Sequence, residues 1–150
     1  MKTIIIILLS SLIWVGISCK NDNEKLLDSI SGTWQVDKIT CKNLSNKPDS
    51  TINCTNCVLQ IDNCTLGNGG CGGYYKLMDG QKVNIIQSPS GKAQELSMSI
   101  VGEPASPLYQ LIGRYAIENL SGNSMTLIGF FAYKTNNGIK QVDAEIQMKK

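Results

Sequence analysis

Cysteines are the residues of this chain whose type and spacing could do chemistry. Four of the six fall within CTNCVLQIDNCTLGNGGC, from Cys54 to Cys71, and the chain has no histidine. Four thiolates could bind zinc, Cys54-Thr-Asn-Cys57 has the spacing of a redox pair, and cysteines of exported proteins form disulfides. The compartment of the chain decides between these three chemistries.

The N-terminal segment predicts export. Lys2 precedes an uncharged, largely apolar run from Thr3 to Ser18, which is the pattern of a secretory signal peptide. This run is shorter than the roughly 20 apolar residues that a transmembrane helix needs. It ends in VGISC, which resembles the lipobox of bacterial lipoprotein signals, although Gly16 stands where leucine is usual.

The lipobox resemblance implies a location and a division of the chain. Cys19 is the expected lipid attachment site, residues 1–18 form the expected signal peptide, and residues 19–31 form a lipidated tether with a short helical turn. Lys20 is not the aspartate that usually signals retention in the inner membrane. We therefore expect a lipid-anchored protein of the outer membrane of a Gram-negative bacterium, on its periplasmic or cell-surface face.

In an oxidising compartment the five cysteines after Cys19 are expected to form disulfides. A redox pair needs a helix N-terminus, but the close pair runs directly into the strand-like VLQI. Zinc sites usually have two close pairs, and here a single close pair precedes two isolated cysteines. We predict a bridge between Cys64 and Cys71 across a hairpin. A second bridge is predicted between Cys41 and either Cys54 or Cys57, which leaves one cysteine unpaired.

Other arrangements that could support catalysis are weak. Without histidine, triads of the serine or cysteine type and His-ligated metals are excluded. The glycines of LGNGGCGG are not followed by the helix and Lys-Ser/Thr of a phosphate-binding loop. The 14 basic and 12 acidic residues form no block of like charge, so nothing indicates nucleic-acid binding. We expect no enzyme activity, no cofactor, no metal and no nucleic-acid partner.

The chain after the tether shows the period-two pattern of half-buried strands. A short helical turn in KLLDSI precedes TWQVDKIT, where Trp34 and Val36 alternate with polar residues. Further strands are expected at VLQID, YYKLM, KVNII, ELSMSIV, RYAIE, MTLIGFFAY and QVDAEIQMK. Asp79 and Gly80 separate two of them, which is a strong hairpin signal.

About eight short strands, each apolar on one face, predict an all-β fold. An antiparallel up-and-down barrel would bury these faces and leave no exposed edge, whereas a sandwich is the alternative. The interior of an eight-stranded barrel is just wide enough for side chains or one small ligand. We predict one such domain over residues 32–150.

Several motifs resemble the lipocalin-like domains of bacterial outer-membrane lipoproteins, which are calycin-type barrels. ISGTWQVDKI carries Gly-x-Trp at the first strand. GRYAIENLSGNSMTLIG and AEIQMKK supply a Tyr-x-Ile strand, a Leu-Ser turn, a Met-x-Leu strand and a basic tail. GNGGCGGYYKLMDGQKVNI more weakly resembles META domains, because Gly72 replaces the expected asparagine. Both resemblances imply an all-β domain on a lipid tether.

The barrel and the resemblance together imply a binding function. We expect a monomer that holds a small apolar ligand in an interior cavity. The residues expected to line this cavity are Trp34, Leu59, Tyr75, Leu77, Tyr115, Ile117 and Ile146. The alternative is a structural or interaction protein whose loops, at residues 42–56 or 102–112, contact an envelope protein.

Overall fold

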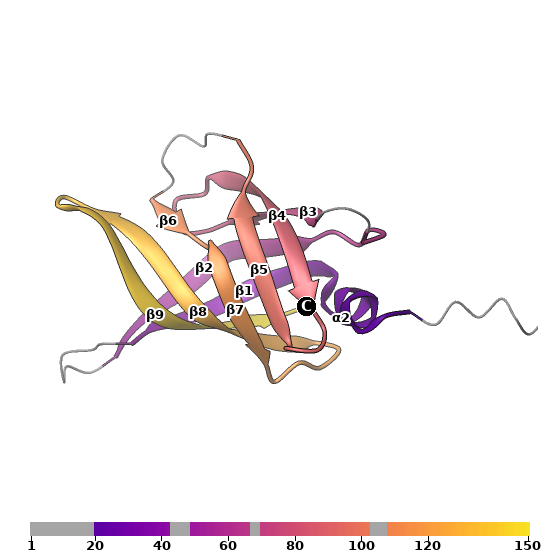
Figure 1. The fold of residues 1–150 in the computed structure, drawn as a ribbon. Coiled ribbons are helices and arrows are strands. Elements are labelled where there is room, and N and C mark those ends of the chain that lie inside the picture. The colour runs from indigo at the N-terminus through magenta and orange to yellow at the C-terminus, as the bar shows by residue number, and fades with distance from the viewer. Residues whose placement is uncertain (1–19, 43–48, 67–69, 103–107) are drawn as a thin grey trace, which may run out of the picture.

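The computed structural model describes residues 20–42, 49–66, 70–102 and 108–150 (Figure 1). Residues 1–19, which include the predicted signal peptide and Cys19, lie outside the described residues. Helix α2 (Asp22–Ile30) comes first. The strands are β1 (Gly32–Cys41), β2 (Ser50–Ile61), β3 (Cys71–Lys76), β4 (Lys82–Ser90), β5 (Glu95–Ile100), β6 (Tyr109–Gln110), β7 (Gly113–Glu118), β8 (Ser124–Thr135) and β9 (Gly138–Lys149).

Eight of these strands form a closed antiparallel barrel. Strands β1 to β5 pair in sequence order, β5 then pairs with β7, β7 with β8, and β8 with β9. Closure comes from β9, which pairs with β1 from Gln35↔Lys149 to Cys41↔Ala144. Strand β6 lies beside β8 through two residue pairs only. The predicted all-β class and the up-and-down barrel of about eight strands are confirmed.

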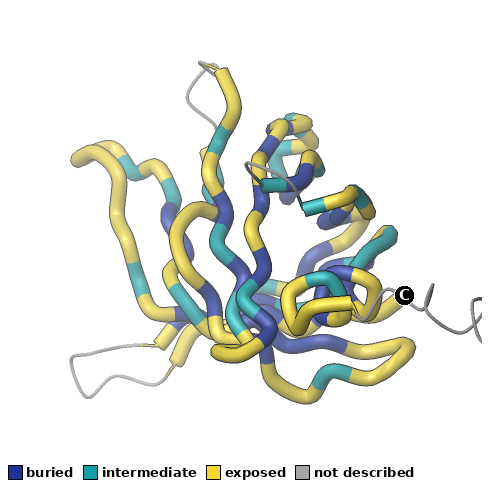
Figure 2. Tube along the Cα trace, turned by 45° about the vertical axis from the view of Figure 1, so that its right-hand side comes forward, coloured by how far each residue is buried: buried dark blue, intermediate teal, exposed yellow. Residues whose placement is uncertain are grey.

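The predicted period-two pattern becomes the inner and outer faces of this barrel. In β9, Ala144, Ile146 and Met148 are buried, whereas the residues between them are exposed or half-buried. The same alternation of buried and exposed segments follows most strands in Figure 2. Successive side chains of a strand point to opposite faces, so the apolar set of each strand faces the common core.

Helix α2 covers one end of the barrel. Asn21 caps its N-terminus in a capping box, in which its side chain accepts from the Glu24 amide and the Glu24 carboxylate accepts from the Asn21 amide. Leu26, Leu27 and Ile30 are buried. A nine-residue helix is marginal on its own in water. Packing of this apolar face against the barrel therefore stabilises α2.

Trp34 in β1 contacts both the helix before the first strand and the residue after the last strand. Its side chain is fully buried, and its indole Nε1 donates a hydrogen bond to the carbonyl oxygen of Ile30 at 2.6 Å. The Lys150 ammonium lies 4.5 Å from the centre of the indole ring, within range of a cation–π interaction. One tryptophan thus contacts the helix that precedes β1 and the residue that follows β9.

The prediction of a surface loop over residues 42–56 is largely wrong. Strand β2 already begins at Ser50, which pairs with Cys41 at the end of β1. This half of β2 is rich in Ser, Thr and Asn, so its sequence lacks the apolar alternation of a strand. Pairing with β1 overrides that weak local preference. The predicted loop at residues 102–112 contains β6, and residues 103–107 lie outside the described part.

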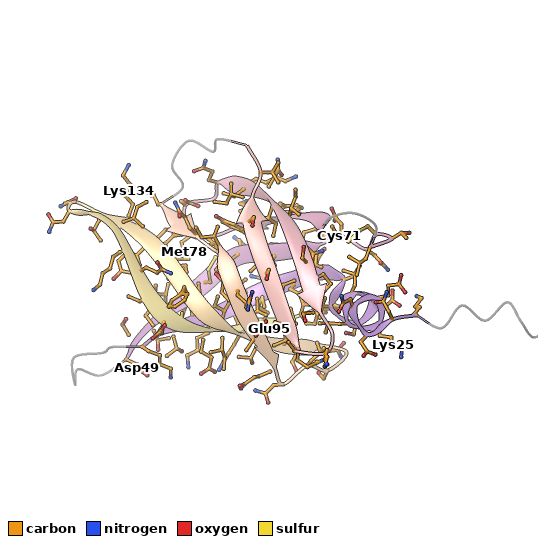
Figure 3. The ribbon with its side chains drawn as sticks, viewed as in Figure 1. Lys25, Asp49, Cys71, Met78, Glu95 and Lys134 are labelled. Atoms are coloured by element: carbon orange, nitrogen blue, oxygen red, sulfur yellow. A yellow bond between two sulfur atoms is a disulfide. The ribbon has the colours of Figure 1, made fainter. Side chains whose placement is uncertain are left out.

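The predicted disulfide between Cys64 and Cys71 is confirmed. Cys64 follows the end of β2 and Cys71 begins β3, so the bridge closes the connection between two paired strands. Closing a loop of this length stabilises a fold by about 2.5 kcal/mol in the chain-entropy model. Cys71 lies near α2 in Figure 3, so this bridge is at the helix-covered end of the barrel.

The predicted bridge from Cys41 to Cys54 or Cys57 is wrong. Cys54 and Cys57 are bonded to each other, and Cys41 is a free, buried thiol. The register explains the difference, because Cys41 lies opposite Ser50 and Val36 lies opposite Cys57. Cys41 is therefore several residues along the barrel wall from both candidate partners.

A bulge in β2 makes the Cys54–Cys57 bridge possible. Val36 pairs with Cys57 and Lys38 pairs with Asn53, so β2 holds three residues where β1 holds one. Asn56 within this bulge has a φ of 60°, in the left-handed region that asparagine tolerates. The extra residues bring both cysteines to the buried face of the strand, where they bond.

Candidate ligand-binding site

The structure brings the predicted cavity residues together inside the barrel. All seven are buried and belong to one core cluster. They are Trp34, Leu59, Tyr75, Leu77, Tyr115, Ile117 and Ile146. None of three clefts formed by described residues is lined by any member of this set. The burial of the seven is what inward-facing residues require, and these three clefts lie elsewhere.

Two of these clefts lie against helix α2 and have mixed linings that include charged side chains. The first, of about 430 Å³, is lined by Lys20, Glu24, Leu27, Asp28, Asn63, Cys64 and Thr65. The second, of about 260 Å³, is lined by Asp22, Lys25, Leu26, Ser29, Gly91, Gln94 and Leu120. Ion pairs within these walls join Lys20 to Asp28 and Lys25 to Asp22. Both linings carry charged side chains, unlike the predominantly apolar linings typical of small-molecule sites.

The third cleft, which we call the side cleft, has a volume of about 440 Å³ and a mainly apolar lining. Its lining residues are Met98, Ser99, Ile100, Ile112, Gly113, Phe130 and Gln141. This volume lies within the range of about 300–1,000 Å³ that is common for ligand pockets. Four apolar side chains with one hydroxyl and one amide form a surface suited to an apolar molecule with a polar group.

Incomplete strand pairing opens the side cleft in the barrel wall. β5 pairs with β7 only as far as Met98↔Gly113, although β5 continues to Ile100. β7 pairs with β8 only over Ala116–Glu118. The wall between the end of β5 and the middle of β8 is therefore not closed by a continuous ladder. Phe130 of β8 and Ile112 before β7 lie at this break.

Tyr115 fastens β7 to β8 beside the side cleft. Its hydroxyl donates to the carbonyl oxygen of Phe130 at 2.6 Å and lies 3.3 Å from the carbonyl oxygen of Ile112. The ring lies directly over Gly129, where an added Cβ would come within 2.5 Å of ring carbon Cδ1. Burial raises the pKa of Tyr115 far above its usual value, so the hydroxyl stays protonated as a donor.

Replacing Tyr115 with phenylalanine is expected to lower the free energy of unfolding by about 1–2 kcal/mol, because the Phe130 carbonyl loses its buried donor. Urea unfolding followed by circular dichroism measures this change. Tyr74→Phe is the control, since Tyr74 is half-buried and keeps its ring under the Lys82 ammonium. Equal effects of the two substitutions would contradict a bracing role for the Tyr115 hydroxyl.

Aromatic side chains gather near the barrel end opposite α2. The rings of Tyr109 and Phe131 stack at 6.0 Å between centroids, and Tyr133 lies 6.1 Å from Phe131. The Tyr75 hydroxyl is 3.5 Å from the carbonyl oxygen of Tyr109. Burial raises the pKa of Tyr75 to about 12, whereas unfolded tyrosine titrates near 10. Between these values the unfolded chain loses a proton that the folded chain keeps, so stability falls as pH rises.

The sequence contained a signal for the side cleft that period-two reasoning did not use. LIGFF in β8 is apolar at consecutive positions, so Ile128 and Phe130 are exposed while Leu127 and Phe131 are buried. A strand that is apolar on both faces is expected to have a partner on the outer one. Ile112, another exposed apolar residue of the side cleft, gave no such signal in the sequence. Its exposure depends on where β7 begins.

The fold and the site define a closed eight-stranded antiparallel barrel with a docked N-terminal helix, two disulfides and an apolar cleft in its wall. Comparisons with protein-family models, curated proteins and solved structures found no match for this chain. Within the part of the chain that the structure describes, the one helix is too short and too polar to span a bilayer.

Proposed function

We propose that this chain is a lipid-anchored envelope protein that binds a small apolar or amphipathic molecule in its side cleft. The observation that carries this proposal is the side cleft itself, which combines an apolar lining with a ligand-sized volume. The proposal moves the expected ligand from the centre of the barrel to its wall. We propose no catalytic role and no cofactor.

The lining chemistry supports an apolar ligand with one polar group. Met98, Ile100, Ile112 and Phe130 would contact the apolar part. Ser99 and Gln141 could hydrogen-bond a hydroxyl or carbonyl group at the rim. Phe130 is 47% exposed and Ile112 is 36% exposed, so the side cleft presents contiguous apolar surface to solvent.

The location in this proposal comes from the lipoprotein-like signal. Cys19 would carry the lipid in the outer membrane of a Gram-negative bacterium, as the VGISC motif implies. The resemblance to lipocalin-like lipoproteins fits this proposal better than the META resemblance does, because the barrel is closed and up-and-down. The protein would act there as a monomer.

Replacing Phe130 with serine is expected to weaken binding of an apolar probe about tenfold, the effect of losing roughly 1.4 kcal/mol of contact. The probe is 1-anilinonaphthalene-8-sulfonate, whose fluorescence rises in apolar surroundings. Ile86→Ser is the matched control, because Ile86 is 46% exposed and lies outside the side cleft. Native mass spectrometry of protein purified from membranes would then identify a natural ligand by its mass.

The two serine variants separate a site from general surface hydrophobicity. Weaker probe binding in Phe130→Ser with unchanged binding in Ile86→Ser supports the side cleft as the site. Equal loss in both variants, or no binding by the unmodified protein, contradicts it. Circular dichroism of each variant checks that the barrel remains folded.

An envelope protein partner is the second candidate function. Val101 and Leu108 are about half exposed and flank residues 103–107, close in sequence to the side-cleft residues Ile100 and Ile112. A partner that covered these side chains would use the same face of the barrel. Photo-crosslinking from position 108 in intact cells tests this alternative, and a single specific adduct would favour it over the small ligand.

A further inference from the structure

The folded part of the chain begins almost at the proposed lipid attachment site. The α2 capping box fixes Asn21, and Asn21 follows Cys19 by two residues. Two residues span at most about 7 Å. The lipid and the barrel are therefore joined by much less chain than the tether over residues 19–31 that the sequence predicts, because most of that segment is the docked helix α2.

Helix α2 is held firmly to the barrel, so it cannot act as a flexible spacer. Three of its apolar side chains are buried, and the amide of Gly91 donates to the Asn23 side chain at 2.8 Å. A Cβ at Gly91 would collide with the carbonyl oxygen of Asp22, which shows how closely the helix approaches the β4–β5 turn. Asp28 pairs with Lys20 at 2.5 Å and accepts from Asn63 at 3.2 Å.

We propose that the barrel stands on the bilayer with its α2 end against the lipid headgroups and its opposite end pointing away. This inference rests on the proposed lipidation of Cys19. The membrane-facing surface would consist of exposed residues of α2 and of the neighbouring β4–β5 turn. They are Asp22, Lys25, Ser29, Lys92 and Gln94.

The short connection, and not charge, sets this orientation. Lys25 is 3.6 Å from Asp22, and Lys20 is paired with Asp28, so much of the positive charge at this end is balanced. Exposed pairs of this kind attract anionic lipids only weakly, and salt screens them. The orientation is therefore expected to be the same on neutral and anionic membranes.

The orientation determines which direction the side cleft faces. β5 starts at Glu95, close to the turn that contacts α2, and reaches the side cleft at its far end, Ile100. Five residues of strand place this end of the side cleft about 17 Å along β5 from the turn, and so farther from the bilayer. Figure 3 shows Lys25 at the α2 end and Lys134 at the tip of the β8–β9 hairpin, at opposite ends of the molecule. A ligand would enter from the aqueous side.

The test uses the full acylated protein in phosphatidylcholine vesicles that carry a nitroxide quencher on the headgroup. A nitrobenzoxadiazole label is attached through Lys25→Cys or through Lys134→Cys, each in a Cys41→Ser background. β8 separates the two ends by roughly 30 Å, so quenching at position 25 is expected to exceed quenching at position 134 at least threefold. Lys92→Cys provides a second near position and Asn136→Cys a second far one.

Two further arms make the result decisive. A flexible spacer of about ten Gly and Ser residues after Lys20, spanning roughly 17 Å, is expected to reduce the contrast at least twofold. Replacing part of the lipid with phosphatidylglycerol is expected to leave the contrast unchanged. Equal quenching at near and far positions in vesicle-bound, lipidated protein overturns the orientation alone. Protein that carries no lipid by mass spectrometry and does not bind vesicles overturns the proposed anchoring on which it rests.

Discussion

Replacing Trp34 with alanine is expected to lower the free energy of unfolding by about 3–5 kcal/mol, the range for removing a fully buried tryptophan. Domains of this size have a total stability of about 5–15 kcal/mol, so this loss is a large part of the total. The substitution also removes the hydrogen bond to Ile30 and the contact with Lys150. Circular dichroism during urea unfolding measures the loss without relying on tryptophan fluorescence.

Two milder variants separate the contributions at Trp34. Trp34→Phe keeps an apolar ring and loses the Nε1 donor, so its effect should be less than half that of alanine. Lys150→Gln removes the cation over the ring, a contribution of about 0.5–1 kcal/mol, together with the 3.5 Å hydrogen bond from the ammonium to the carbonyl oxygen of Ser29. If Trp34→Ala stayed within about 1 kcal/mol of the unmodified protein, this side chain would not be central to the stability of the barrel.

Replacing Cys19 with alanine is expected to abolish lipidation completely. The thiol that the lipobox resemblance marks for acylation would be gone, and the uncut precursor with residues 1–18 would remain. Intact mass spectrometry of protein extracted from membranes measures both the lipid and the retained signal.

Cys41→Ala is the matched control for this experiment. Cys41 is the free cysteine of the described residues, and it is buried at the end of β1. Burial raises the pKa of its thiol, which makes it a poor nucleophile. Its replacement should leave processing and lipid mass unchanged. Lipid on a Cys19→Ala protein would contradict the proposed attachment site.

Most strands of this barrel were predictable because half-buried antiparallel strands alternate in polarity. QVDAEIQMK, for example, marked β9 through Val142, Ala144, Ile146 and Met148. The Cys64–Cys71 bridge was predictable for a related reason, since the two cysteines lie on either side of one connection. Both predictions need only local sequence, which is why they held.

The features that were missed depend on contacts between distant segments. The first half of β2 is polar and forms a strand because β1 lies beside it. The Cys54–Cys57 bridge requires a bulge whose position depends on the β1–β2 register. The side cleft exists because β7 stops pairing with β8 at Ala116, and no local pattern in β7 indicates that point.

Barrel closure through β1 and β9 has a consequence for folding kinetics. Gln35 and Lys149 are paired although 114 residues separate them in the sequence. Contacts of such long sequence separation form late, because the entropy of the intervening chain must be lost first. We expect folding on a timescale of milliseconds to seconds, as in other β proteins of high contact order. In the proposed export, the barrel would close only after β9 had crossed the membrane, so the chain would be transported before its core had formed.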